Sequence, residues 1–423
     1  MMLFVLFNYQ ALRTSKDALV ISAGGASVIP FLKGYVVFPA SIAFVLLYSK
    51  LISAFSKQTV FYIISSGFLC FYLLFSTVLY PFRDALHPSL ETVATWSETI
   101  PALKYFISIF ATWSFSIYYV LAELWGSAML SLLFWQLAND VTTTKEAKRF
   151  YPMFGLIGNI GLILSGVAGK KFYHISKQFP DNQWGVNLSL IASSIIVSGI
   201  GTILCYKYLN KKDNNEDNNS TEPKPSPKKK PKLSPKESMK LLVQSKYLLL
   251  IATLVICYGI SMNLIDILLK NQLNALLKDP NDYNEFLQNI SIGTGVFTML
   301  TILFSKGIVQ KFGWLKGAII TPLIILITGA AFFSFSLFPD SLSGIGACLS
   351  MSPLLISVWI GTFQNILSKG VKYGLFDPTK EMAYIPLDDE LKTKGGTLQG
   401  TIETVLGQSF SAKGLEIRQQ MSN

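Results

Sequence analysis

Apolar stretches long enough to cross a lipid bilayer recur along almost the whole chain. A membrane-spanning helix needs about 20 mainly apolar residues, and the stretches that meet this requirement alternate with polar segments. The expected spans are 1–26, 31–54, 59–80, 105–137, 150–170, 186–209, 247–268, 286–305, 314–337, 345–367 and 396–412. The pattern predicts an all-α polytopic membrane protein with about 11 transmembrane helices.

The composition agrees with this prediction. Of 423 residues, 51% are hydrophobic and only 14% are charged, whereas an ordinary soluble domain carries about 25% charged residues. The chain has too few charged residues to solvate the surface of a soluble protein of this length. Most classes of soluble enzyme are therefore excluded.

More than half of the net charge of +11 lies in one segment. Residues 207–246 contain eleven lysines against five acidic residues, a local net charge of +6. Because its prolines, asparagines and lysines cannot form a core, we expect 210–246 to be a basic disordered cytoplasmic linker. It separates an N-terminal six-helix half, 1–209, from a C-terminal half, 247–423. Tyr208 is the one aromatic residue that accompanies the lysines before the second half, so we expect no nucleic-acid partner.

The distribution of other cations indicates the same orientation. Lysine and arginine accumulate in cytoplasmic loops, and the loops on the linker side carry Lys50, Lys57, Lys145, Lys148, Arg149, Lys306, Lys311, Lys369 and Lys372. Loops 81–104 and 270–286 are poorer in net positive charge, although Lys170, Lys171 and Lys177 fall on the expected outer face. The N-terminus and the central loop are thus predicted to be cytoplasmic. Six spans, a long basic loop and a second set of spans are typical of a major-facilitator-like, two-halved transporter.

Charged residues inside the expected spans mark the candidate site. An ionisable group at membrane depth is costly and is tolerated mainly where it lines a polar cavity. Arg13, Lys16 and Asp17 share one span, and spacing allows Asp17 to pair with Arg13. Glu123 lies in the middle of an uncharged run, and a partner for it is Lys16 or Arg13. Asp266 lies late in its span, where an interfacial position is nearly as plausible as a functional one.

Other chemistries find little support in the sequence. The four cysteines lie in apolar runs and are interpreted as packing residues. Because the two histidines lie in connecting segments, we expect neither a catalytic triad nor a metal site. Gly161-x4-Gly166 continues with Val-Ala rather than the Lys-Ser/Thr of a phosphate-binding loop. The spacing of Gly155, Gly158 and Gly161 is better explained by close helix packing. We expect a gradient-driven transporter, not an enzyme, without a cofactor.

At this point the sequence resembles the ATP/ADP translocases of plastids and obligate intracellular bacteria. The resemblance covers nearly all of 7–395, in the same order. Matching stretches are 7–9 (FNY), 12–17 (LRTSKD), 122–127 (AELWGS), 134–139 (FWQLAN), 147–152 (AKRFYP), 158–161 (GNIG), 257–259 (CYG), 364–369 (QNILSK) and 376–387 (FDPTKEMAYIPL). The last is the most specific, although by composition alone it predicts a cytoplasmic loop.

The resemblance implies a set of charges for transport. It assigns Lys16, Glu123, Asp266 and Lys380 to the charged positions of the family, with aspartate at 266 where the family usually has glutamate. Lys16 and Lys380, with Arg13 auxiliary, are expected to bind the phosphates. Glu123 and Asp266 are expected to serve coupling or gating by holding Lys16 and Lys380 while the site is empty. Tyr119, Tyr258 and Asn263 are candidates for the base pocket.

The implied function is exchange of ATP for ADP across a bacterial inner membrane, with import of host ATP by a monomer embedded in the lipid bilayer. The chain departs from the family after Lys394-Gly395, and its last helix is expected to be missing, as are residues upstream of the first. Two alternatives stay open. One is an importer of other nucleotides or NAD, by proton coupling or exchange; the other is a transport-inactive truncated membrane protein.

Overall fold

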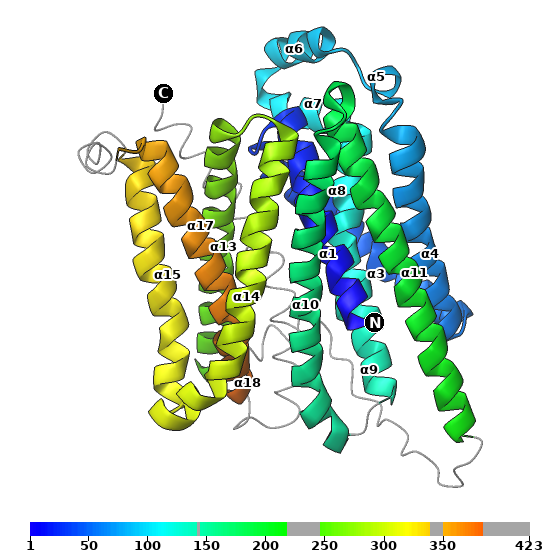
Figure 1. The fold of residues 1–423 in the computed structure, drawn as a ribbon, viewed down its shortest axis with the longest axis vertical. Coiled ribbons are helices and arrows are strands. Elements are labelled where there is room, and N and C mark those ends of the chain that lie inside the picture. The colour runs from blue at the N-terminus through cyan, green and yellow to red at the C-terminus, as the bar shows by residue number, and fades with distance from the viewer. Residues whose placement is uncertain (142–143, 218–245, 339–349, 384–423) are drawn as a thin grey trace.

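The computed structural model describes residues 1–141, 144–217, 246–338 and 350–383. Every regular element in these ranges is a helix, which confirms the all-α prediction. Most helices run nearly parallel to one another along the long axis of the molecule (Figure 1). Among the residues that the structure describes, eight helical runs are long and apolar enough to cross a membrane.

The N-terminal half contains α1 to α11. Its first helix, α1 (Met2–Gly24), is central, because it packs against α8, α10, α11 and α14. The other elements are α2 (Val28–Phe31), η1 (Leu32–Val37), α3 (Phe38–Ala54), α4 (Lys57–Leu74), η2 (Phe75–Leu79), α5 (Arg83–Leu86), α6 (Leu90–Thr99), η3 (Pro101–Leu103), α7 (Lys104–Ala111), α8 (Trp113–Trp125), η4 (Gly126–Phe134), α9 (Trp135–Val141), α10 (Thr144–Ser176), η5 (Pro180–Asn182) and α11 (Gln183–Asp217).

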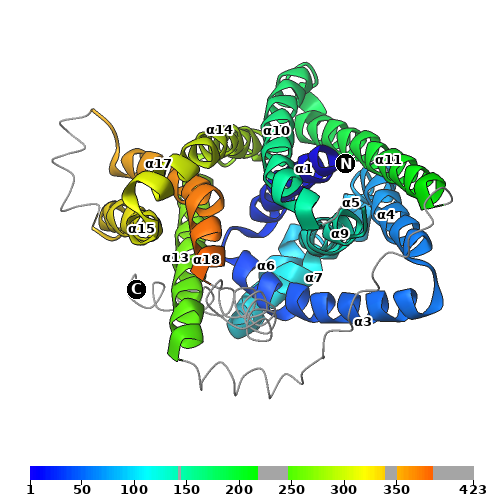
Figure 2. The ribbon, with the colours of Figure 1, turned by 90° about the horizontal axis from the view of Figure 1, so that it is seen from below.

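The C-terminal half begins with α13 (Lys246–Leu276). It continues with α14 (Pro280–Phe312), α15 (Trp314–Leu337), α17 (Pro353–Val371), η6 (Lys372–Phe376) and α18 (Asp377–Ala383). The two halves meet mainly where α14 lies against α10 and α1 (Figure 2). We call the end of the bundle where α11 ends and α13 begins the linker end, and the opposite end the distal end.

Local sequence explains several helix starts. Asp279 caps α14 by accepting a hydrogen bond from the backbone N–H of Asn281 at 2.6 Å, and Pro280 fits the first turn because it needs no backbone donor there. Ser352 and Pro353 begin α17 in the same way. Between α14 and α15 the chain turns at Gly313, whose φ of +84° favours glycine.

Close helix contacts explain two of the three glycines singled out on α10. A Cβ on Gly161 would lie 2.4 Å from the backbone oxygen of Leu3, and one on Gly158 would lie 2.2 Å from a methyl of Leu6. Both positions let α1 approach α10 closely. Gly155 has no such neighbour within 4 Å.

Some expected boundaries are wrong. The stretch 105–137 is interrupted at Thr112, between α7 and α8. α13 continues beyond 268 to Leu276, so much of the expected loop 270–286 is helical. The motif expected as a loop by composition begins in η6 and continues as α18. α11 extends beyond 209 to Asp217, whereas most of the expected linker and the whole span 396–412 lie outside the described residues, so the total of about 11 helices stays a prediction.

Candidate functional site

A continuous series of ion pairs crosses the centre of the bundle. In the N-terminal half, Lys16 on α1 lies 3.0 Å from Glu123 on α8 and 2.9 Å from its neighbour Asp17. Lys33 on η1 is a second and more distant partner of Glu123, at 3.6 Å. Glu123 therefore pairs with Lys16, one of the two partners expected for it, and also with Lys33, which the sequence analysis missed.

The series continues into the C-terminal half through Lys270 on α13. Its ammonium lies 2.8 Å from Asp17 and 2.7 Å from Asp266, one helical turn earlier on α13. The other oxygen of Asp266 accepts hydrogen bonds from Lys369 at 3.3 Å and from the amide of Asn365 at 3.2 Å, both on α17. Asp266 is thus held inside the bundle rather than at an interface.

Burial makes these pairs interdependent. Lys16, Asp17 and Lys270 are almost fully buried, and the ring of Tyr119 lies 3.8 Å beneath the ammonium of Lys16. Removing one partner of a buried ion pair leaves an uncompensated charge and costs about 3–5 kcal/mol. Because each carboxylate serves two lysines, the charges form one network rather than separate bridges.

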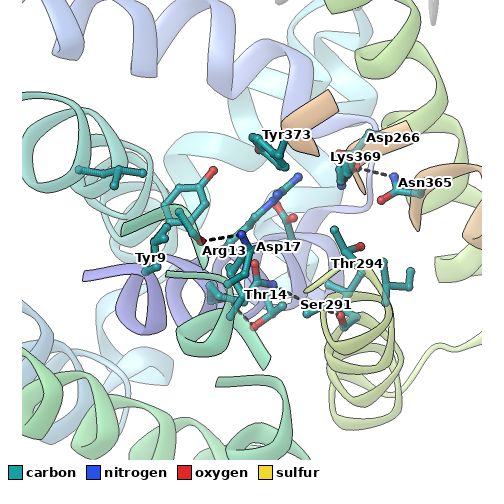
Figure 3. A pocket seen from close by; sticks show the side chains of 18 of the residues that line it. Tyr9, Arg13, Thr14, Asp17, Asp266, Ser291, Thr294, Asn365, Lys369 and Tyr373 are labelled. Carbon is teal, nitrogen blue, oxygen red and sulfur yellow. Dashed lines mark hydrogen bonds and ion pairs between the residues drawn. The ribbon is translucent and has the colours of Figure 1, made fainter. Parts of the chain in front are cut away.

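Two cavities adjoin this network. The larger, of about 890 Å³, extends from Asp17 and Lys270 toward the linker end. Figure 3 shows Arg13 and Asp17 of α1 in this cavity, with Asp266 and Lys369 of the other half nearby. Its lining is Met2, Leu6, Tyr9, Gln10, Arg13, Thr14, Asp17, Leu130, Trp135, Gly155, Asn159, Leu162, Asp266, Leu269, Lys270, Leu273, Leu287, Ile290, Ser291, Thr294, Ile302, Asn365, Lys369, Tyr373, Asp377 and Lys380.

The smaller cavity, of about 470 Å³, shares Tyr9, Arg13, Leu130, Asp266, Lys369 and Tyr373 with the larger one. Its remaining lining is Lys33, Val37, Ser41, Glu123, Gly126, Ser127, Tyr258, Gly259, Met262, Asn263 and Lys372. Nine of the 26 residues that line the larger cavity are aliphatic, against three of the 17 that line the smaller one.

The predicted cations occupy different places. Arg13 lines both cavities, and no carboxylate of a described residue lies within ion-pair distance of its guanidinium. Lys380 lines the larger cavity and lies 3.6 Å from Asp377. Lys16 lies behind the cavity wall, between Asp17, Glu123 and Tyr119.

Two expected pairings are wrong. Asp17 does not pair with Arg13, because its oxygens face Lys16 and Lys270 instead. Asp266 does not hold Lys380, because Lys270 and Lys369 occupy its two oxygens. Helical spacing alone could not choose among these cations, since the choice depends on which helices meet at the centre.

The candidates for the base pocket are also separated. Tyr258 and Asn263 line the smaller cavity, and Tyr258 stacks on Phe376 with ring centroids 5.1 Å apart. Tyr119 is fully buried beneath Lys16 and lines neither cavity.

Lys270 and Lys369 were expected in loops and lie instead at the site. Assigning Lys270 to an outer loop was wrong because Asp17 and Asp266 neutralise it and allow α13 to continue through it. The i,i+4 spacing of Asp266 and Lys270 was the sequence signal for this pair. Lys369 lies in the last turn of α17 and faces Asp266.

Polar contacts also join the halves toward the distal end. Tyr173 on α10 donates a hydrogen bond to Asp282 on α14 at 2.5 Å, and Lys177 lies 4.4 Å from the Tyr173 ring. The amide of Asn187 on α11 donates to Asn281 at 3.1 Å. Deeper in the bundle, Gln288 donates to Thr14 at 2.8 Å, and Gln10 donates to Ser291.

Metal ligation has no candidate cluster of histidine, cysteine and acidic residues within the described ranges. The charged groups of the site are instead arranged as cations and carboxylates that can exchange partners with an incoming anion.

Comparison with known proteins gives consistent results. A family model described as the TLC ATP/ADP transporter matches residues 1–419. ADP,ATP carrier protein 1 of Chlamydia pneumoniae is 43% identical over 416 residues, which are 96% of this chain and 81% of that protein. ADP,ATP carrier protein 2, chloroplastic, of Arabidopsis thaliana is 42% identical over 410 residues, covering 96% of this chain and 66% of the relative.

The fold is shared with a more distant protein. The inward-facing crystal structure of a bacterial homologue of the iron transporter ferroportin superposes with a TM-score of 0.60 at 15% identity, over 97% of this chain and 88% of the other. This likeness concerns the fold alone, and it supports the major-facilitator-like, two-halved bundle.

Proposed function

Because the chain belongs to the TLC ATP/ADP transporter family, we propose that it exchanges ATP for ADP across a membrane and binds both in its central cavities. It is a multi-pass membrane transporter rather than an enzyme. The single observation that carries the site assignment is Arg13, whose guanidinium lies at the wall shared by both cavities without a carboxylate partner among the described residues.

The charge of the substrates demands such a site. ATP carries about four negative charges and ADP about three, and burying them requires paired cations. Arg13, which lines both cavities, is proposed to bind the phosphates directly, and Lys380 in the larger cavity adds a further cation to the nucleotide site. Lys16 joins them when an incoming phosphate competes with Glu123 and Asp17 for its ammonium.

The two carboxylates are proposed to prevent movement of the empty carrier. Glu123 holds Lys16 and Lys33, and Asp266 holds Lys270 and Lys369. When a nucleotide takes over some of these cations, the network loosens and the halves can rock about the site. An empty carrier retains its ion pairs, which favours exchange over one-way transport. Of the three residues expected in a base pocket, Tyr258 and Asn263 can contact the nucleotide from the smaller cavity, whereas Tyr119 lines neither cavity.

We further propose that the protein works as a monomer in a bacterial inner membrane and imports host ATP. Its linker end faces the cytoplasm. Support for this orientation comes from the lysine-rich segment between α11 and α13 and from the positive-inside rule.

Uptake of labelled nucleotide by cells expressing the chain tests this function. We expect ATP uptake that unlabelled ADP inhibits, together with efflux of preloaded label when ADP is added outside. Preferred competition by another nucleoside triphosphate or by NAD would contradict the assigned substrate. Absence of uptake from correctly inserted protein would instead identify a transport-inactive protein.

A further inference from the structure

We propose that the smaller cavity is the subsite for the polyphosphate chain of the nucleotide, with Lys33, Lys369, Lys372 and Arg13 as its cations. The base and ribose then extend into the larger, more aliphatic cavity. This inference rests on the proposed function and adds the direction in which the nucleotide lies. It also gives Lys33, Lys369 and Lys372 a direct contact with the substrate.

The two cavities differ in the charge and polarity of the residues that line them. The smaller cavity has four cations against two carboxylates, whereas the larger one has four cations against three carboxylates and a larger share of aliphatic side chains. A nucleotide is equally asymmetric, with an anionic chain at one end and a flat, weakly polar base at the other. Matching the two leaves the fewest buried charges without a partner.

Ion-pair distances show which cations can accept a new anion. Each central carboxylate has a short contact with a buried lysine, at 3.0 Å from Glu123 to Lys16 and at 2.7 Å from Asp266 to Lys270. Each also has a longer contact with a lysine of the smaller cavity, at 3.6 Å from Glu123 to Lys33 and at 3.3 Å from Asp266 to Lys369. The cavity lysines are therefore the more weakly held members of each group. A phosphate can therefore engage these two lysines first, while Lys16 and Lys270 still neutralise the carboxylates.

The same arrangement occurs in both halves of the protein. Lys33 and Arg13 come from the N-terminal half, and Lys369 and Lys372 come from the C-terminal half. A phosphate chain held by all four pulls the halves toward each other across the smaller cavity. Binding energy is then directly linked to the rearrangement of the two halves, as alternating access requires.

The backbone around the smaller cavity gives a second, independent reason to place a binding site there. Three π-helical segments reach this cavity, with Lys33 on η1, Ser127 on η4 and Lys372 on η6. π-Helical turns are rare and occur frequently at functional sites, because the extra residue per turn redirects side chains. Their convergence on one small cavity is explained if the side chains they present bind substrate.

Binding of inorganic tripolyphosphate to the purified full-length protein tests the subsite without requiring transport. We expect tripolyphosphate to bind and to compete with ATP. Lys33→Gln and Lys369→Gln should each weaken the binding of tripolyphosphate and of ATP by about ten- to a hundredfold, because each removes a charge-assisted hydrogen bond. Lys33→Arg and Lys369→Arg keep the charge and should restore most of the affinity.

Lys311→Gln is the matched control, because Lys311 is an exposed lysine at the end of α14. If Lys33→Gln and Lys369→Gln weaken tripolyphosphate binding no more than Lys311→Gln does, the subsite is wrong. Selective loss of binding in Lys380→Gln would also overturn it, by placing the phosphates in the larger cavity. The subsite and the proposed function can fail separately. If the Gln variants lose tripolyphosphate binding but the unsubstituted protein does not exchange ATP for ADP, the subsite is supported and the proposed function is contradicted.

Discussion

Asp17 on α1 and Lys270 on α13 form an ion pair of 2.8 Å that joins the two halves of the bundle. Both side chains are almost completely buried, and each has a second ionic partner within its own half. The pair links the Lys16–Glu123 contact of the N-terminal half to the Asp266–Lys369 contact of the C-terminal half. It therefore couples the two groups of charges on which the transport mechanism depends.

Breaking this bridge on one side should destabilise the protein. Asp17→Asn and Lys270→Gln each leave a buried charge with one partner fewer, at an expected cost of up to about 3–5 kcal/mol. The double variant removes both charges and should lose less stability than the sum of the single variants. Thermal unfolding of the purified proteins measures this coupling, and strictly additive losses would contradict it.

Replacing Lys16 should abolish exchange while leaving the helices inserted. Lys16→Gln removes the cation that neutralises both Asp17 and Glu123, and Lys16→Arg should retain part of the activity because it keeps the charge. Lys380→Gln should also abolish uptake, since Lys380 lines the larger cavity. Normal uptake rates in either Gln variant, at equal amounts of protein in the membrane, would remove that lysine from the mechanism.

Glu123→Gln should weaken the requirement for a counter-substrate. The change frees Lys16 and Lys33 from their shared carboxylate, so the empty carrier loses part of the restraint on its movement. We expect a lower rate of ATP/ADP exchange. We also expect internal ADP to stimulate ATP uptake several-fold less than it does in the unsubstituted protein. An unchanged ratio would show that Glu123 contributes no such restraint.

The hydrogen bond between Tyr173 and Asp282 should favour closure of the distal end. Tyr173→Phe removes one hydrogen bond to a charged group, worth about 1.5–3 kcal/mol, and should shift the population toward a distally open form. Spin labels at Gln178 and Lys278, both exposed near this end, report the separation of α10 and α14. If the distances between the two labels are the same in the Tyr173→Phe variant as in the labelled protein that keeps Tyr173, this role is contradicted.

The close approach of α1 to α10 predicts different outcomes for two glycines. Gly161→Ala would place a Cβ 2.4 Å from the backbone oxygen of Leu3, so α1 has to shift and stability falls by about 1–3 kcal/mol. Gly67→Ala on α4 is the control, because no atom lies within 4 Å of the added Cβ. That change should stabilise the helix slightly. Equal melting temperatures of the two variants would contradict the packing argument.

Sequence reasoning identified the class of fold and most of the charged helices for a clear physical reason. Apolar length and charge depletion are local properties, and a bilayer imposes them strongly. Glu123 was recognisable because it interrupts a long uncharged run. Lys270 was misplaced because a lysine near the end of an apolar run looks like an interfacial residue until its partners are known.

The network itself could not be derived from the sequence. Which cation faces Asp17 depends on the approach of α13 to α1, and these helices are far apart in the chain. The cavities depend on the same packing, so Lys33 and Lys372 became candidates only when η1 and η6 were seen at one wall. Lys380 became a candidate only through the resemblance to the translocases, because the composition of residues 376–387 alone indicated a loop.

Counter-substrate dependence in proteoliposomes tests the central claim most directly. Purified protein is reconstituted into vesicles that contain ADP or no nucleotide, and uptake of labelled ATP is followed with and without a protonophore. We expect rapid uptake only into vesicles loaded with ADP, matched by release of ADP and unaffected by the protonophore. Equal uptake into empty vesicles that the protonophore abolishes would contradict exchange and establish proton-coupled import.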